Sequence, residues 1–249
     1  MLKPNPNYGH GTFRRRVQLI VAPGQVNVDL EDSNHAFRLV LRHDGERITT
    51  IEPEVVRHPF TTCPEAVRSL RVLIGRPLDG TLDLRRELET RAGCTHLTDM
   101  VQLAVAHMRD VGLRRLYDIA VDDEREGLTH ARIACDDHAV HDWVIVRHTM
   151  VEPGVHAGRP LMKGFHGWAM AAFAGLEFEA ATMLQRGYFV AQSRRFVSEP
   201  AREHPAGADG LPDGVCHSYS TPAVQRAQRI DGSKRDFTND ADALLRFKR

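Results

Sequence analysis

The sequence predicts an α+β fold in which an antiparallel sheet packs against several helices. In the first part of the chain apolar residues alternate with polar ones, and one such run ends at Asp44-Gly45, a dipeptide typical of tight hairpin turns. Residues 63–74, 94–108 and 164–190 instead repeat apolar residues at the spacing of one helical face. Hairpins combined with amphipathic helices indicate a sheet that buries its apolar face against helices.

The overall composition excludes several classes of protein. The 249 residues suffice for one large domain or two small ones, and 33 basic residues balance 33 acidic ones, so no basic surface for nucleic acid is indicated. No apolar run reaches membrane-spanning length, and the four cysteines are widely spaced without a Cys-x-x-Cys pair. We therefore expect a cytoplasmic protein that acts on a small molecule, without nucleic acid or membrane partners; a homodimer is compatible with the sequence.

Two hairpins are expected near the N-terminus. Alternating apolar positions from Arg14 to Leu30 break at Pro23-Gly24, which predicts two strands joined by a turn. Residues 35–43 and 47–56 form the second pair and lead directly into the next predicted helix.

The first predicted helix begins at Cys63. Thr62 and Glu65 have the spacing of a capping box, and Pro64 falls in the first turn, where its missing N–H costs nothing. Gly75 ends the helix. The apolar face consists of Ala66, Val67, Leu70, Leu73 and Ile74.

The second predicted helix begins near Cys94, with Thr95 as its expected cap. A thiol at a helix N-terminus feels the positive end of the backbone dipoles, which favours the thiolate and lowers the pKa. His96, two residues on, can serve as base, metal ligand or hydrogen-bond partner. The alternative interpretation is that Cys63 and Cys94 are both small buried core residues, as free cysteines usually are.

The second half of the chain predicts further strands and a long apolar helical stretch. Cys135 lies inside one of these strands and is expected in the core. The helical stretch forms one or two helices, with Gly175 as its only obvious breaker. The strands and the helical stretch cover residues 113–121, 131–135, 143–146 and 164–190.

The expected domain organisation has three parts. A main α+β domain covers residues 14–197. Residues 198–214 are rich in proline and glycine, which predicts a flexible loop that is long for a compact domain. Residues 215–249 then form a C-terminal segment that packs back on the domain.

Several different short motifs are spread along nearly the full length of the chain, from about residue 14 to residue 237. They are Arg14-Arg-Arg16, Leu30-Glu-Asp32 with His35, Leu41-Arg-His-Asp-Gly45, Pro59-Phe-Thr-Thr-Cys63-Pro64, Cys94-Thr-His-Leu97, Asp142-Trp143, Gly158-Arg-Pro-Leu161, Gly164-Phe165 with Trp168, and Arg229 with Gly232-Ser-Lys-Arg-Asp-Phe237. In these motifs the chain resembles a bacterial family of proteins of unknown function. The resemblance implies no particular activity.

A weaker similarity links one stretch to the iron–sulfur scaffold and sulfur-acceptor fold. The stretch runs from Phe60-Thr-Thr-Cys63 to Leu73-Ile-Gly75-Arg-Pro-Leu78, where a hairpin meets a helix with a cysteine at its start. The departure is that a scaffold gathers several thiolates in a compact domain, whereas Cys63, Cys94 and Cys216 are spread along this chain. The similarity implies an α+β architecture more than any sulfur chemistry.

The leading hypothesis is an enzyme that acts on a small anionic or aromatic organic substrate through a Cys/His site. Cys94 and His96 are the candidates for nucleophile or base, with Cys63 close by and His35 as a further catalytic candidate. No Gly-x-Gly-x-x-Gly or Walker A motif occurs, which argues against a nucleotide cofactor; other cofactors stay open. The candidates for binding an anionic substrate are Arg57, Arg159 and Arg235.

Three alternatives remain open. The first is a zinc or iron–sulfur site in a sulfur carrier, for which the ligand candidates are Cys63, Cys94, His96 and Cys216, with His217 adjacent. The second is an acid–base site among neighbouring His and Asp residues such as His141-Asp142, although neighbours on a strand point to opposite faces. The third is a non-catalytic module that binds a small ligand.

Overall fold

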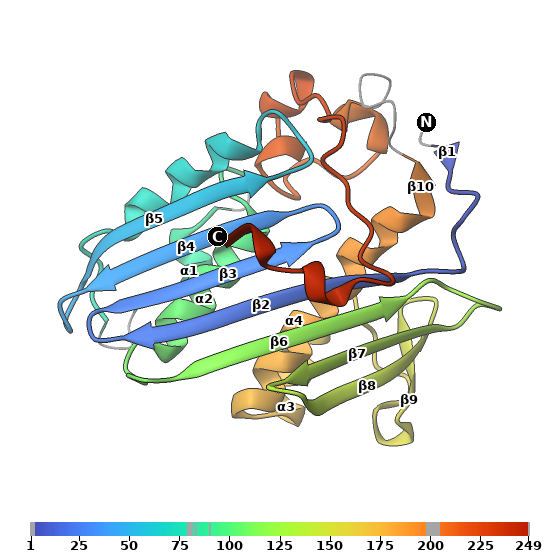
Figure 1. The fold of residues 1–249 in the computed structure, drawn as a ribbon, viewed down its shortest axis with the longest axis horizontal. Helices are drawn as coiled ribbons and strands as arrows, with labels where there is room; N and C mark the ends of the chain where they lie inside the picture. Colours follow the sequence, from blue (N-terminus) through green and yellow to red (C-terminus); the bar gives the residue numbers. More distant parts are fainter. Residues whose placement is uncertain (1–2, 79–81, 83, 90, 198–204, 249) are drawn as a thin grey trace.

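A single eight-stranded antiparallel sheet organises the molecule, with strand order β5-β4-β3-β2-β6-β7-β8-β9 (Figure 1). The computed structural model describes residues 3–78, 82, 84–89, 91–197 and 205–248. The strands are β2 (Thr12–Ala22), β3 (Gln25–Asp32), β4 (Ala36–His43), β5 (Ile48–Arg57), β6 (Arg114–Asp122), β7 (Thr129–Cys135), β8 (His138–Val146) and β9 (Thr149–Glu152). A small second sheet pairs β1 (Lys3–Pro4) with β10 (Phe196–Val197). The predicted α+β class is confirmed.

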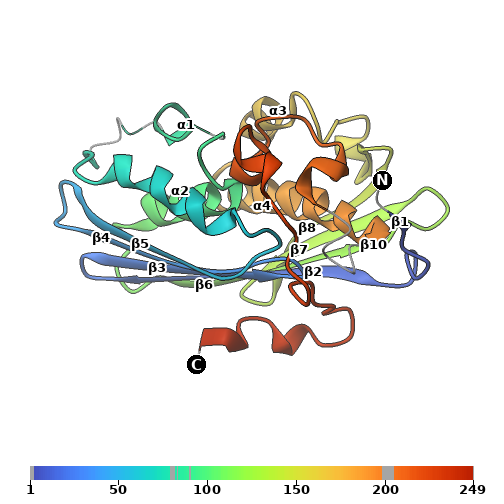
Figure 2. The same cartoon turned by 90° about the horizontal axis from the view of Figure 1, so that it is seen from above.

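The helices cover one face of the large sheet (Figure 2). Helix α2 (Thr95–His107) packs on β2, β3 and β4, and helix α4 (Gly175–Ala191) packs on β2, β6, β7 and β8. The elements of this layer are the 3-10 helix η1 (Cys63–Leu73) and the α-helices α1 (Leu84–Glu87), α2 (Thr95–His107), α3 (Phe165–Ala172) and α4 (Gly175–Ala191).

The end of the chain lies on the opposite face of the sheet (Figure 2). Arg14 of β2 donates from Nε to the carbonyl oxygen of Thr238 at 3.2 Å, and Arg38 of β4 donates from Nη2 to that of Phe247 at 2.7 Å. The Arg38 guanidinium also lies over the Phe247 ring. Two short 3-10 turns, η8 (Ala241–Ala243) and η9 (Arg246–Lys248), complete this segment.

Each half of the chain contributes the same order of elements. Strands β2 to β5 form a meander that is followed by α2, and strands β6 to β9 form a second meander that is followed by α3 and α4. The halves join where β2 pairs with β6, with Val17 opposite Tyr117. The sequence shows no matching internal repeat, so the arrangement became visible only in the structure.

Burial alternates strictly along β2, as the sequence pattern predicts. Phe13, Val17, Leu19 and Val21 are buried. Arg15 interrupts this apolar row and is nevertheless only 3% exposed. A charged side chain on the buried face must be paired, because isolated buried charges are strongly unfavourable.

Both cysteine-bearing helices begin near the expected residues but differ in detail. The segment after Cys63 is a 3-10 helix rather than an α-helix, and the expected capping box is absent. The Thr62 hydroxyl instead donates to Ser218 Oγ, so a long-range contact replaces the local one. Helix α2 has Cys94 as its N-cap, one residue before the expected Thr95.

The apolar stretch at residues 164–190 forms two helices rather than one. Phe173 and Ala174 have extended backbone, which ends α3 and starts α4. Within the described residues, the helices are all too short or too polar to cross a bilayer.

After β10 the structure describes the chain again from residue 205 onward. Of the loop expected at 198–214, residues 198–204 lie outside the described residues, whereas Ala206 starts the 3-10 turn η5 (Ala206–Asp209) and is buried. Ala206 packs with Phe60 and Ala227 in a second, smaller core. This core connects the C-terminal half to the start of η1.

Candidate functional site

Three of the four cysteines lie around one junction, where the starts of η1 and α2 meet the turn η6 (His217–Tyr219). Cys94 Sγ lies 3.8 Å from His96 Nδ1, and Cys63 Sγ lies 3.4 Å from Ser218 Oγ. The residue after Cys216 donates its backbone N–H to the carbonyl of Gly93, next to Cys94. Cys135 is buried in β7, as expected.

Burial makes these thiols less acidic. It raises the pKa of Cys63 to about 11 and also raises the pKa of Cys94 and of Cys216. The expectation that a helix N-terminus lowers the pKa of Cys94 is therefore wrong. Desolvation of the thiolate outweighs the backbone N–H groups of His96 and Leu97, which favour it.

His96, beside the thiol of Cys94, also packs against a second histidine. The rings of His35 and His96 have centroids 4.0 Å apart at an interplanar angle of 33°, and Phe37 meets His96 edge-on. Burial lowers the pKa of His96 well below its usual value, so its imidazole is neutral at pH 7. The structure thus brings together His35 and His96, which lie 61 positions apart in the chain.

A buried carboxylate, Asp32, completes this cluster. His35 Nδ1 lies 3.1 Å from Asp32 Oδ1, and Arg15 donates from Nη2 and Nε to Oδ2 at 2.6 and 3.0 Å. The backbone N–H groups of Asn34 and His35 also donate to Oδ1. Burial alone would raise the pKa of Asp32, but His35 and Arg15 outweigh it and hold the pKa well below its usual range.

Asp32 and Arg15 were not among the expected site residues. Both stand in motifs that carried the family resemblance, Arg14-Arg-Arg16 and Leu30-Glu-Asp32 with His35. A charged residue on the apolar face of a predicted strand was the second signal, since such a residue requires a buried partner.

Arg57, expected to bind substrate, instead holds the β3–β4 turn. It is only 9% exposed, and its guanidinium donates to backbone carbonyls and to one buried carboxylate. The acceptors are the carbonyl oxygens of Asp32, Ser33, His35 and Ser233 and the carboxylate of Glu31.

Arg235 and Arg159, the other two arginines expected to bind an anionic substrate, lie in different parts of the structure. Arg235 lies beside the same turn, where its backbone N–H donates to the carbonyl of Ser33 and its guanidinium lies 3.8 Å from Glu31. Arg159 lies elsewhere, in an exposed loop that bonds to β9 through Met150 at the far edge of the sheet.

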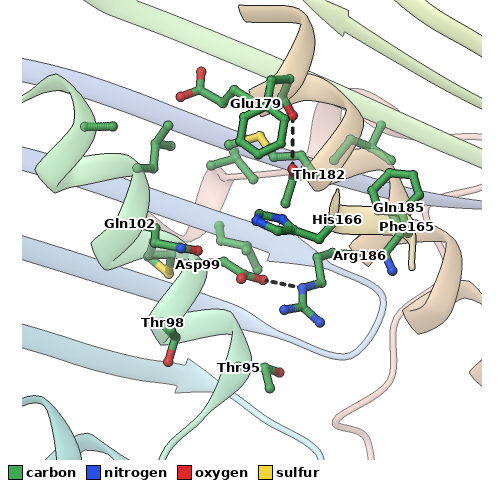
Figure 3. Close-up of a pocket in the computed structure, with 18 of the residues that line it drawn as sticks. Thr95, Thr98, Asp99, Gln102, Phe165, His166, Glu179, Thr182, Gln185 and Arg186 are labelled. Carbon is green, nitrogen blue, oxygen red and sulfur yellow. Dashed lines mark hydrogen bonds and ion pairs between the residues drawn. The ribbon is translucent and has the colours of Figure 1, made fainter. Parts of the chain in front are cut away.

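A cavity of about 1010 Å³ lies between α2 and α4 (Figure 3). Side chains of β2, β3 and β6 contribute to its wall, together with residues of α2, α3 and α4. Much of the wall is apolar, with Val17, Leu30, Met100, Leu103, Ile119 and Leu176 among the lining residues.

A few polar side chains converge in this cavity. Figure 3 shows Asp99 of α2, His166 of α3 and Arg186 of α4 directed to the same part of it. Asp99 Oδ2 lies 3.4 Å from Arg186 Nε. Burial raises the pKa of Asp99, although Arg186 and Arg15 act in the opposite direction. The result is a carboxyl group of reduced acidity near an imidazole and a guanidinium.

Arg15 connects the cavity to the histidine cluster. It lines the cavity and at the same time donates to Asp32. Thr95, the residue before His96, also lines the cavity. The cavity and the cluster therefore share a wall. Sequence reasoning missed the cavity because its polar residues look like the ordinary solvent-facing side of three amphipathic helices.

Residues 16–109 match the model of the family described as Protein of unknown function (DUF2889). This match confirms the expected resemblance to a family of unknown function. The matched region runs from β2 through α2 and contains Asp32, His35, Cys63, Cys94 and His96. No curated protein and no solved structure matched the chain.

Proposed function

We propose that the protein binds and converts a small organic molecule with an apolar body and an anionic group, in the cavity between α2 and α4. The cavity itself carries the proposal. Its volume of about 1010 Å³ and its apolar wall with few convergent polar groups are typical of small-molecule sites, which range over about 300–1,000 Å³.

In this proposal Arg186 binds the anionic group of the substrate. Within the described residues its contact with Asp99 uses Nε, so the two Nη groups can donate to a carboxylate or sulfonate. The apolar wall holds the body of the molecule. An anionic or aromatic substrate was expected from the sequence, and this cavity suits that class.

Asp99 and His166 are the groups proposed to move a proton. Burial raises the pKa of Asp99, so its carboxyl keeps its proton to a higher pH than an exposed one and can serve as a proton donor, while the imidazole of His166 can accept a proton. A nucleophilic role for Cys94 gains no support, because its thiol is less acidic than an exposed one. The four free cysteines agree with a cytoplasmic location, which is part of the proposal.

The alternative of a sulfur or iron–sulfur carrier has less support. Among the described residues, Cys63, Cys94, His96 and Cys216 do not form a group whose ligand atoms lie within 4.8 Å of one another. The non-catalytic ligand-binding alternative uses the same cavity and differs only in the role of Asp99 and His166. An identified ligand separates catalysis from non-catalytic binding. Catalysis is supported if the wild type converts this ligand and Asp99→Asn still binds it but no longer converts it.

The first experiment measures binding of 8-anilinonaphthalene-1-sulfonate, an anionic aromatic probe, by fluorescence titration. We expect Arg186→Gln to raise Kd about tenfold, because a hydrogen bond to a charged group contributes about 1.5 kcal/mol or more. Ala106→Trp, which places a large ring in the cavity wall, should abolish binding. Arg132→Gln, at an exposed site on β7, is the matched control and should leave Kd unchanged.

Circular dichroism shows whether each variant is folded, since the probe also binds partly unfolded chains. Equal probe affinity in all folded variants would place the probe outside the cavity and contradict the proposal. With the site established, thermal-shift measurements on aromatic and aliphatic carboxylates would narrow the substrate class.

A further inference from the structure

We propose that Asp32, His35 and His96 form a binding site for a divalent transition-metal cation of the zinc type. The three side chains come from the end of β3, the β3–β4 turn and the first turn of α2. Each offers one ligand atom, and these atoms all lie within 4.8 Å of one another. Among the described residues, Asp32, His35 and His96 are the group of three His, Cys, Asp or Glu side chains whose ligand atoms lie this close together.

The spacing is close to that of a metal site. Ligand atoms bound at about 2.0–2.1 Å in tetrahedral geometry lie roughly 3.3 Å from each other. His35 Nδ1 and Asp32 Oδ1 are already 3.1 Å apart, with a hydrogen-bonding proton between them. A cation would take the place of that proton, which leaves to solvent, and His96 would complete the set after a small movement.

His96 supplies the second observation that points to a ligand. Its ring lies against His35 and Phe37, and the hydrogen-bond contact of its Nδ1 is with the Cys94 sulfur at 3.8 Å. A ring nitrogen in such surroundings has only a weak partner, whereas polar groups of this kind are normally hydrogen-bonded. A bound cation would provide the missing partner.

The surrounding residues hold the ligands in position. Arg15, itself 3% exposed, fixes the carboxylate of Asp32 through Oδ2 and leaves Oδ1 toward His35. Arg57 fixes the backbone carbonyls on both sides of the turn that carries His35. Metal sites in proteins are built in this way, with ligating groups oriented by hydrogen bonds from a second layer of residues.

The donor set selects the class of cation. Two imidazoles and one carboxylate suit zinc, ferrous iron and cobalt, whereas magnesium and calcium prefer all-oxygen ligands. Three protein ligands leave a coordination position for water or a further group.

The test is isothermal titration calorimetry of the chelator-stripped full-length chain with zinc chloride, and optical spectroscopy with cobalt(II). We expect one equivalent to bind, and His35→Ala and His96→Gln each to weaken binding by at least about 100-fold. His138→Ala, at an exposed histidine of β8, is the matched control and should change nothing. Circular dichroism confirms that each variant is folded.

Two results would overturn the proposal. One is the absence of one-equivalent binding by the folded wild-type chain. The other is binding that survives in His35→Ala and His96→Gln but is lost in Cys63→Ser and Cys216→Ser, which would assign the cation to the thiol junction. These readouts involve no substrate, so they are independent of the cavity proposal.

Discussion

Arg57 illustrates how a buried arginine can serve the backbone instead of a ligand. From the sequence it was a candidate for binding an anionic substrate. In the structure its guanidinium is surrounded by carbonyl oxygens and by Glu31, and both of its Nη groups already donate to them. A guanidinium has five donors in a planar fork, which makes it well suited to holding a turn.

Replacing Arg57 with alanine should therefore reduce stability. We expect a loss of about 3–5 kcal/mol in the free energy of unfolding, because the buried Glu31 loses its ion pair with Arg57 and several backbone carbonyls lose a donor. Urea denaturation measures this. The control is Arg42→Ala, at an exposed ion pair, which should change stability by less than about 1 kcal/mol. A stable Arg57→Ala variant with weakened ligand binding would restore the substrate-binding interpretation.

At the scale of elements, the contact between α4 and β6 depends on one glycine. A Cβ atom added at Gly187 would lie 2.8 Å from Ile119 Cγ2, closer than non-bonded carbon atoms approach. The glycine lets the helix lie close to the sheet beneath the cavity. Gly167 in α3 has no such neighbour within 4 Å.

The two glycines give opposite predictions for the same substitution. Gly187→Ala should lower the free energy of unfolding by about 1–3 kcal/mol, since the helix must move away from the sheet. Gly167→Ala should be neutral or stabilising by up to about 1 kcal/mol, because alanine restricts the unfolded chain and favours the helix. Thermal unfolding of both variants tests this, and similar melting temperatures would contradict the close packing of α4.

For the whole molecule, long-range contacts attach the C-terminal half to the first helices. Glu65 of η1 forms ion pairs with Arg226 and His217, and Phe60 packs with Ala206 and Ala227. Hydrogen bonds to Arg226 and His217 lower the pKa of Glu65 to about 2, from an ordinary value near 4.5. A carboxylate with a lowered folded-state pKa stabilises the fold above its unfolded pKa, and the contribution is lost as the pH falls.

Glu65→Gln should therefore cost stability at neutral pH but not in acid. Since Glu65 is 31% exposed, we expect a loss of only about 1 kcal/mol at pH 7. The difference from wild type should shrink as the pH falls below about 4.5 toward 2. Urea denaturation at pH 7, 5 and 3 measures it, with Glu46→Gln in the exposed β4–β5 turn as control. A difference that is independent of pH would exclude the ion pairs as its source.

Local patterns of sequence were sufficient for most elements. The strands of both hairpins, their turns at Pro23-Gly24 and Asp44-Gly45, and the position of α2 were predicted correctly, because alternation and helical spacing are properties of neighbouring residues. For residues 164–190 one or two helices were expected with Gly175 as the breaker, and α4 begins at that glycine. The helix type of η1 was not predicted; its start is held by a contact with a distant segment, that of Thr62 with Ser218.

The sequence by itself determined the fold class, the order of strands and helices along the chain, and the residue types available for chemistry. Only the tertiary structure decided which of them meet. It separated Arg159 from the other candidates, joined His96 to His35 and Asp32, and formed a largely apolar cavity in which polar residues of three helices converge. The physical reason is that alternation and amphipathicity act over a few residues, whereas burial, pKa and ligand geometry depend on groups that are brought together only when the chain folds.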